Sequence, residues 1–489
     1  MAFQALNQLG SQSDILLATS SNEELDNTPE ILSCIENVKF TQELIEDIST
    51  ATFKNGCLDN NVIYHLHNPQ ACNEPTAISD PDIRLSLDLF LAVTNASEKT
   101  YHACCGAILH CYPDSGVLSY HSVKWLVAET TGIVAVYNNM CINSCHAFTG
   151  PFTQLWFCSI CGEAQYDVTQ AALTSKDVTC QQFCTILLSP QLQALCQSHS
   201  GAMDMCYLDQ KMKQVAEMFN NLQAKGGADV IYDNIFSGSE FQDLAEHING
   251  NDTVVSLSLD GAQLYQNKKS DTWISIWILN NFSPNQHYQK QHVLPGTVIP
   301  GPNKPKIIDS YLYCGIHHLS ALQYEYNSAG LCMWDAATSR VIKLHIVLAL
   351  STADAVGITE LDGCVGHHGM RSCRLGCQMK GWHKPHSGHY YAVHLRPNNY
   401  TVQDCNHPDI NIHNLCAPSS IDYQQDLLKV VSLPNQNHYQ INQKETGIRK
   451  PTILSGLVDN LMVPVLCCFP LDLMHLIFIN LGKLLLPLW

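Results

Sequence analysis

The order of strands and helices predicted between residues 253 and 350 limits the fold more than any other feature of this sequence. Short runs rich in β-branched and aromatic residues, bounded by turn residues, predict four strands. Apolar residues at helical spacing fill the segment before the last strand. The strands are predicted at 253–260, 272–280, 292–299 and 341–350, and the helix at 307–326. This order of strand, strand, strand, helix, strand predicts an α/β fold.

Two aspartates stand at strand ends in this series. Asp260 closes the first strand, and Asp354 lies just past the fourth. If these two strands are neighbours, the carboxylates converge and can hold a pair of Mg²⁺ or Mn²⁺ ions for phosphodiester chemistry. Asp362 competes for the second role. A third acid is expected from a later helix, where Asp472 is the candidate. Asp472 could instead cap the N-terminus of that helix. Glu445 is a weaker option for the third acid.

Four cysteines form the strongest motif. Cys141, Cys145, Cys158 and Cys161 have the spacing C-x3-C-x12-C-x2-C, and Gly162 suits a tight turn after the last one. Two close pairs of thiolates supply the tetrahedral ligands that zinc needs, and four protein ligands are typical of a structural site. The alternative is four unrelated thiols in a chain with 23 cysteines. The start of the chain does not resemble a secretory signal, so disulfides are not expected.

A second Cys/His set lies further along, at Cys373, Cys377, His389 and His394. Its spacing, C-x3-C-x11-H-x4-H, also satisfies zinc. Neighbouring histidines crowd the same stretch, so a solvated His-rich loop is the alternative.

Residues 363–400 form the clearest basic patch, since they contain no acid. Such a patch can neutralise phosphates, or it can balance the acidic N-terminal segment. Its five basic residues are Arg371, Arg374, Lys380, Lys384 and Arg396.

The charge of the whole chain, −18, excludes a uniformly basic nucleic-acid coat but not a local basic site. Residues 1–80 hold twelve Asp and Glu and only two Lys. This composition predicts a mostly disordered tail with a transient helix near Ile31–Ile48. Further helices are expected near 83–93, 98–111, 119–130 and within 207–248. No stretch of eighteen uncharged apolar residues occurs, so no membrane span is predicted.

An ordered set of motifs resembles transposases of the CACTA (En/Spm) class, in the form seen in fungal genomes. The resemblance runs from about residue 80 to 489. Its motifs are SLDGAQLYQNKKSDTWISIWIL, HVLPGTVIPGPNKPK, LDGCVGHHGMRSCRLGCQMKG, NHPDINIHNL and CFPLDLMHL. It implies an RNase-H-like catalytic core, a mixed sheet flanked by helices, with an acidic metal-binding triad. It further implies a nuclear protein that acts on double-stranded DNA at transposon ends. A homo-oligomer is a further possibility.

By position, Asp260 and Asp354 match the first two catalytic acids of that class, and the third acid is matched less well by Asp472. The resemblance also implies that a C-terminal part of the fold lies beyond Trp489. The expected units are an acidic tail (1–80), a helical region (81–135), a zinc ribbon (136–166), a helical linker region (167–250), the first part of the core (251–362), a Cys/His basic insertion (363–400), an insertion or linker (401–469) and the start of a catalytic helix (470–489).

Arginine is rare, with six residues against 23 histidines and 23 cysteines. Single transitions convert Arg codons that begin with CG into Cys, His, Gln or Trp codons, so the imbalance indicates mutational decay. The sequence therefore predicts a transposase-derived protein whose DNA cleavage and strand transfer are weak or lost. A non-catalytic, zinc-containing DNA-binding relic and an RNase-H-like nuclease unrelated to mobility are the alternatives.

Overall fold

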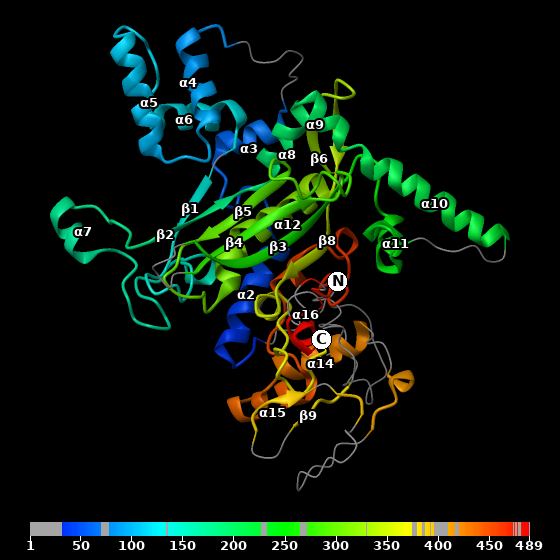
Figure 1. Cartoon of the computed structure of the whole chain (residues 1–489). Helices are drawn as coiled ribbons and strands as arrows, with labels where there is room; N and C mark the ends of the chain where they lie inside the picture. The colour runs from blue at the N-terminus through cyan, green and yellow to red at the C-terminus, as the bar shows by residue number, and fades with distance from the viewer. Residues whose placement is uncertain are drawn as a thin grey trace, which may run out of the picture.

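The computed structural model describes residues 32–69, 78–133, 135–225, 232–264, 271–328, 330–373, 379–383, 387–391, 393–395, 409–415, 420–472, 474, 477 and 481–488. Its centre is a six-stranded mixed sheet in the order β1-β2-β5-β4-β3-β8, flanked by helices (Figure 1). The strands are β1 (Ala135–Asn139), β2 (Gln182–Ile186), β3 (Thr253–Gln263), β4 (Asp271–Leu279), β5 (Val293–Ile299) and β8 (Ile346–Ala353). Only β3 and β8 pair in parallel; the other neighbours are antiparallel. The predicted α/β fold with a mixed, helix-flanked sheet is confirmed.

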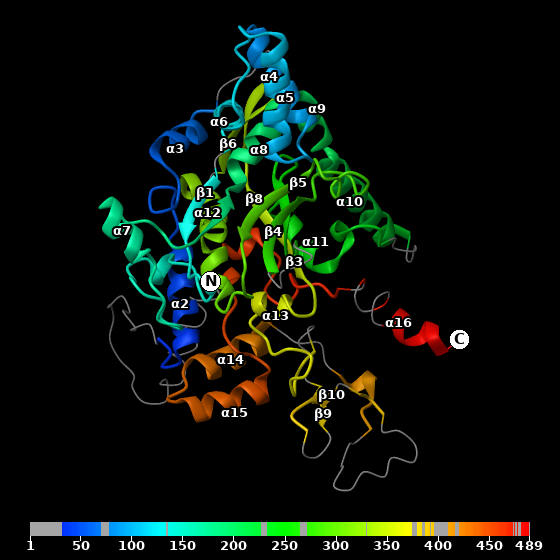
Figure 2. The same ribbon diagram turned by 60° about the vertical axis from the view of Figure 1, so that its left-hand side comes forward.

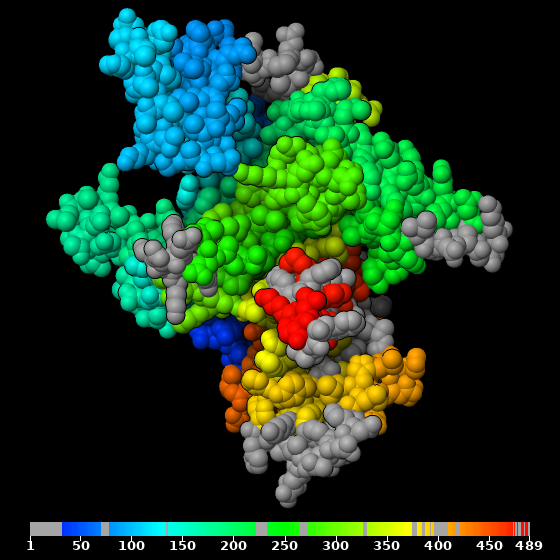
Figure 3. All heavy atoms as spheres, viewed as in Figure 1, coloured from blue at the N-terminus to red at the C-terminus, as the bar shows by residue number. Residues whose placement is uncertain are grey.

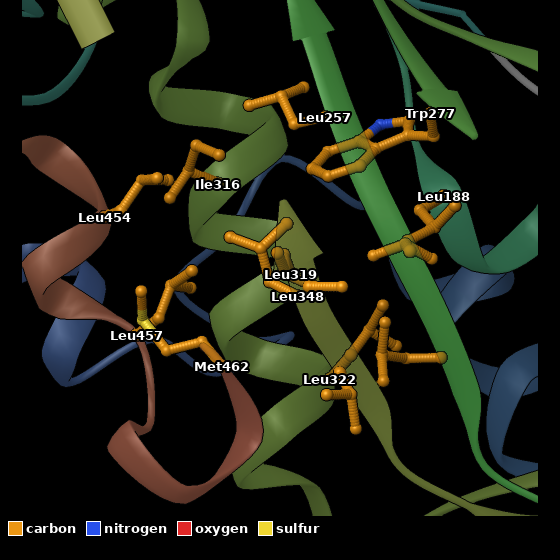
Figure 4. Close-up of a cluster of buried hydrophobic side chains, with 14 of the residues drawn as sticks. Leu188, Leu257, Trp277, Ile316, Leu319, Leu322, Leu348, Leu454, Leu457 and Met462 are labelled. Carbon is orange, nitrogen blue, oxygen red and sulfur yellow. The ribbon is translucent and has the colours of Figure 1, made fainter. Parts of the chain in front are cut away.

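Helix α12 (Ile308–Ser328) is the centre of the hydrophobic core. Figure 4 shows Leu257 and Trp277 of the sheet on one side of this helix, and Leu454 and Leu457 on the other. All four side chains are buried. Burial of a side chain of this size contributes about 1.5–3 kcal/mol, so both faces of α12 contribute to stability.

Residues 33–69 of the N-terminal segment are folded, which corrects the expectation of a mostly disordered tail for this described part. Helix α2 (Glu36–Ser49) buries Val38, Leu44, Ile45 and Ile48 against α12 and the segment around Leu454. The helix lies where a transient one was predicted, near Ile31–Ile48, but its acidic residues alternate with the apolar stripe and composition did not show that this stripe packs on the core. The Thr41 hydroxyl also donates to the buried Asp309 carboxylate at 3.0 Å. A shorter helix, α3 (Asn60–His67), follows.

Residues 448–469 also belong to the core, although 401–469 was expected to be an insertion or linker. Two 3₁₀ turns, η4 (Ile453–Gly456) and η5 (Asp459–Leu461), pack on α12. The chain then runs beside β8, where the Val463 amide donates to Leu348 O at 2.9 Å and the Ser351 amide donates to Cys468 O at 2.7 Å. The apolar residues of this segment, rather than any regular strand, place it in the core.

Several helical units surround this body. Helices α4 (Pro81–Ala92), α5 (Glu98–Cys111) and α6 (Tyr120–Thr131) fall where they were predicted and project as a separate lobe (Figure 3). The remaining α-helices are α7 (Val168–Thr174), α8 (Leu188–Gln197), α9 (His199–Asp204), α10 (Tyr207–Lys225), α11 (Ser239–Ala245), α13 (Ile358–Leu361), α14 (Ser420–Val431), α15 (Gln436–Thr446) and α16 (Gly482–Leu485). The short 3₁₀ turns are η1 (Gly150–Phe152), η2 (Ile235–Ser237), η3 (Ile412–Asn414) and η7 (Leu486–Leu488). Figure 2 shows α14 and α15 below the sheet and α16 away from it.

The fourth predicted strand, 341–350, is split in two. Strand β7 (Arg340–Leu344) pairs with β6 (Leu331–Asp335) as a separate hairpin, and β8 begins two residues later. The break falls at His345, whose amide donates to the Asp252 carboxylate at 2.7 Å while its carbonyl accepts the Thr253 amide at 2.9 Å. A two-stranded ribbon, β9 (Trp382–His383) with β10 (Tyr390–Tyr391), completes the strands of the described residues.

Strands β1 and β2 were not predicted. They come from segments expected to be part of the zinc ribbon and of a helical linker, yet they extend the central sheet. Within the described residues, no helix combines the length and the apolar character needed to cross a membrane.

Candidate metal centre and acidic site

The four cysteines of the strongest motif come together in space. The sulfur atoms of Cys141, Cys145, Cys158 and Cys161 all lie within 4.8 Å of one another, and those of Cys141 and Cys161 are 3.4 Å apart. Tetrahedral zinc with Zn–S bonds of about 2.3 Å separates its sulfurs by about 3.8 Å, so the cluster has the dimensions that one ion needs. Three of the cysteines are buried and Cys161 is exposed. This cluster can bind a metal ion such as zinc.

Each cysteine pair sits on a tight turn. The Ser144 amide donates to Cys141 O at 2.8 Å, and the Gly162 amide donates to Cys158 O at 2.9 Å. Both turns need a left-handed residue, with φ of 57° at Ser144 and 75° at Gly162. Glycine adopts this conformation without the steric cost that serine incurs, in agreement with the role expected for Gly162.

His146 joins the two turns and was not singled out in the sequence. Its ring is fully buried, with Nδ1 2.9 Å from Ala147 O, and Nε2 accepts the Ser159 amide at 3.2 Å. It also stacks on Phe152, with ring centroids 4.4 Å apart. Burial lowers the pKa of His146, which keeps Nε2 neutral and able to accept. His146 therefore supports the cluster without being one of its grouped ligands.

The thiols differ in acidity. Burial raises the pKa of Cys145 to about 11 and raises the pKa of Cys141 further. Burial also acts on Cys161, but hydrogen bonds from the Glu163 backbone, Cys141 and Asn143 outweigh it and lower its pKa to about 7. Cys161 therefore ionises more readily than Cys141 and Cys145 and can offer a thiolate to a metal before they do.

The cysteine turns dock on the start of α12. The Ala147 amide donates to the Ser310 hydroxyl at 2.9 Å, and the Thr149 hydroxyl donates to Ser310 O. The Ile307 amide donates to Cys145 O at 2.9 Å. The cluster is therefore attached directly to the core helix.

The two aspartates predicted as catalytic acids lie at the same end of neighbouring strands. Leu259 of β3 pairs with Ala353 of β8 in parallel register, and Asp260 and Asp354 are the next residues along each strand. Asp260 is exposed and its Oδ1 accepts the Gly261 amide at 2.8 Å; Asp354 is half-buried. The convergence expected from the strand order is present in the backbone register.

Part of the Asp354 carboxylate is already engaged. Its Oδ1 accepts the Val356 amide at 3.0 Å and the Gly357 amide at 2.6 Å. These bonds fix the turn into α13 and leave Oδ2 as the oxygen that can face a cation. Asp362, the competitor, is buried at the end of α13, and its Oδ1 accepts the Cys364 amide at 2.7 Å.

The segment that precedes Asp472 runs beside β8. The Ser351 amide donates to Cys468 O, so the C-terminal segment runs along β8 toward Asp354. Asp472 follows four residues later, half-buried and outside any regular element. Among the residues that the structure describes, however, no three carboxylates bring their oxygens within 4.8 Å of one another. A closed three-acid metal site is not formed.

The cysteine cluster and the acids share one end of the sheet. The strand register shows this. Asn139, the last residue of β1, pairs with Gln182, the first residue of β2. Ile299, the last residue of β5, pairs with Trp273 near the start of β4. Trp273 in turn pairs with Gly261, next to Asp260. The turns that carry the four cysteines leave from this same end of β1.

Asp260 also ends a row of partly exposed residues on the face of the sheet away from α12. On the covered face, Phe183 contacts Tyr311 of α12, with centroids 5.1 Å apart, so the neighbouring Cys184 points the other way. Backbone register connects the row across five strands. Its members are Tyr137, Cys184, Val298, Ile274 and Asp260.

The second Cys/His set is only partly described. Cys377 lies outside the described residues, and Cys373, His389 and His394 are not part of any metal-ligand group found among the rest. His389 instead stacks on His368 at 4.2 Å between ring centroids. The predicted zinc site at these four residues remains a prediction.

Of the basic patch, Arg374, Lys384 and Arg396 lie outside the described residues, and Lys380 is exposed. Arg371 lines a polar cavity of about 320 Å³ with carboxylates around it. The other lining residues are Asp422, Gln425, Asp426, Lys429, Asn442, Glu445 and Thr446. Arg371 thus faces acids of its own chain, and Glu445 lies in this cavity among them.

Comparison of the sequence with models of known protein families gives no match, and comparison with curated proteins gives no similar one. We therefore infer the function from the geometry of the two sites and from the sequence motifs.

Proposed function

We propose that this protein derives from a DNA transposase whose ancestral chemistry was two-metal cleavage and transfer of DNA strands at transposon ends. Asp260 and Asp354 would hold Mg²⁺ or Mn²⁺, with Asp472 as the third acid. The observation that carries this proposal is the parallel pairing of β3 with β8, which ends both strands on a carboxylate at one edge. Two such carboxylates can bind ions that activate a nucleophile and stabilise a leaving oxygen.

Three further features support the proposal. The mixed sheet flanked by helices is compatible with the RNase-H-like core that the motifs imply. The partly exposed row that ends at Asp260 offers the substrate an open sheet face. The cysteine cluster would bind zinc as the structural element of a ribbon, because four thiolates leave no open position for water.

The same geometry favours weak or absent cleavage in this chain. The three acids do not close on a common centre in the described residues, and two backbone amides already occupy Asp354 Oδ1. A short Asp at position 472 must reach the metals from a segment outside any helix. These observations favour a zinc-containing DNA-binding relic as the second candidate function.

The first experiment measures Mn²⁺ binding by electron paramagnetic resonance and DNA binding by fluorescence anisotropy, using the full chain and duplexes that contain the candidate element ends. We expect DNA binding, Mn²⁺ binding that Asp260→Asn weakens, and little nicking of labelled duplex. Asp88→Asn, at an exposed site on α4, is the matched control and should bind Mn²⁺ as the wild type does.

The outcomes separate the candidates. DNA binding with no Mn²⁺ bound at Asp260 would favour the relic. Absence of both DNA binding and Asp260-dependent Mn²⁺ binding would overturn the proposal. Strong nicking that Asp260→Ala abolishes would support the ancestral chemistry and contradict the expected loss of activity.

A further inference from the structure

The loop between β5 and α12 connects the two candidate sites. This segment consists of residues 300–307, has the sequence PGPNKPKI and carries Lys304 and Lys306. It leaves β5 at Ile299, at the sheet end where Asp260 lies, and enters α12 at Ile308. Three prolines limit its backbone freedom.

The cysteine turns hold the second half of this loop. The Lys306 amide donates to Cys145 O at 3.1 Å and to Ser144 O at 3.3 Å, and the Asn303 side chain donates to Asn143 O at 3.3 Å. These acceptors lie on the turn between the first two cysteines. The position of the Lys306 backbone therefore depends on the conformation of a metal-binding turn.

The two lysines have different surroundings. Lys304 Nζ lies 3.1 Å from a carboxylate oxygen of Glu360 and 5.2 Å from the ring centroid of Trp273. The indole of Trp273 packs so closely on Gly261 that a Cβ there would lie 3.0 Å from it. Lys304 is thus neutralised and fastens the loop to the strand end beside Asp260.

Lys306 is exposed, and its ammonium has no ion pair with any residue that the structure describes. A cation without a partner, on a backbone fixed between the metal cluster and the acidic strand end, is suited to contact a phosphate group.

We propose that Lys306 contacts a backbone phosphate of the DNA whose scissile strand lies at Asp260 and Asp354, and that the metal bound by the four cysteines fixes Lys306 for this contact. The inference rests on the proposed function, because it takes DNA as the occupant of the acidic strand end. It adds a phosphate-positioning residue and gives the metal cluster a part in DNA binding. Asn303 and Lys304 are positioning residues for the loop.

The test measures the dependence of DNA affinity on salt for the full chain and its variants. A double-stranded, fluorescently labelled oligonucleotide is the probe, and binding is followed by anisotropy with Ca²⁺ in place of Mg²⁺. One phosphate contact contributes about 0.9 to the slope of log K against log salt, so Lys306→Gln should lower that slope by about one and weaken binding several-fold. Lys343→Gln is the matched control, because Lys343 is also exposed but lies on β7, just before the start of β8 and so at the opposite end of that strand from Asp354.

The role of the metal in fixing Lys306 is tested separately in the same assay. Cys145→Ser, or wild type stripped of metal by a chelator, should lose the same increment of slope, and Lys306→Gln should then lower the slope no further. Circular dichroism checks that each sample is folded. The milder Asn303→Ala, which removes only the contact with Asn143, should give part of the same loss in a fully folded protein.

The results distinguish this inference from the proposed function. Failure of the wild type to bind DNA would overturn the inference, and together with a lack of Asp260-dependent Mn²⁺ binding it would overturn the proposed function as well. DNA binding with an unchanged slope in Lys306→Gln, or an equal loss in Lys343→Gln, would overturn the inference alone. A Lys306-dependent slope that survives in metal-free, folded protein would overturn the role given to the metal.

Discussion

Lys450→Met tests how the N-terminal helix is held on the core. Asp309, at the start of α12, is completely buried, and its Oδ2 accepts from Thr41 of α2 and pairs with Lys450, whose side chain is 14% exposed. Removing Lys450 leaves a buried carboxylate with one neutral donor. Loss of one partner of a buried pair costs about 3–5 kcal/mol.

The matched control is Lys429→Met. Lys429 pairs with Asp426 at 2.7 Å, but its side chain is 58% exposed, and an exposed pair contributes about 0–1 kcal/mol. The two variants should therefore differ by at least about 2 kcal/mol. That difference is roughly a 30-fold change in the equilibrium for opening α2 from α12.

Native-state hydrogen exchange of α2 and α12, with urea denaturation as the global measure, gives the free energies. We expect α2 to lose protection in Lys450→Met and to regain much of it in the double variant Asp309→Asn/Lys450→Met, which buries no charge. A loss below 1 kcal/mol, equal to that of Lys429→Met, would refute the reasoning. A double variant as unstable as the single one would show that packing of the lysine stem, rather than charge, is responsible.

Cys145→Ser should lower bound zinc, measured by atomic emission, from about one ion per chain toward none, while Cys180→Ser leaves it unchanged because Cys180 is outside the cluster. Burial lowers the pKa of His318 to about 3 and that of His317 to about 4, so both histidines take up protons on unfolding below pH 6.5. The free energy of unfolding, measured by urea titration, should therefore be greatest above pH 6.5 and fall below it by up to about 2.7 kcal/mol per pH unit. In His318→Gln the fall should be less steep. Gly363→Ala should lower the unfolding temperature measured by calorimetry, because Gly363 has φ of 69° and a Cβ there would collide with the backbone oxygen of Lys450. Gly388→Ala should not, because a Cβ at Gly388 has no atom within 4 Å.

The sequence contained the local signals of the sheet but not all of its partners. Strands β3, β4 and β5 and helix α12 were predictable because each has its own periodicity and turn residues. Strands β1 and β2 are only five residues long; β1 pairs with β2, and β2 pairs with the distant β5, which local patterns do not reveal. The break at His345 depends on Asp252, which is distant in sequence.

The candidate site was likewise predictable from the sequence only in part. The cysteine spacing predicted a compact cluster because each close pair lies on its own short turn. His146 could have been suspected only from its position next to Cys145. The helix near Ile31–Ile48 was predicted, but its stable packing on α12 was not, because the net charge of the segment drew attention away from the apolar stripe of α2. The pairing of Lys450 with the buried Asp309 follows from no local pattern.

The position of α12 between the two ends of the described chain has a consequence for synthesis on the ribosome. Its apolar surface is closed on one side by α2, whose Thr41 lies 268 residues before Asp309, and by residues 453–462, which Gln323 reaches through a hydrogen bond to Leu461. While the chain is being translated, α12 therefore emerges long before its last partner is made. A nascent chain carrying an uncovered α12 is the form in which chaperone binding or aggregation should be greatest, and folding should be completed only after residue 469 has left the exit tunnel.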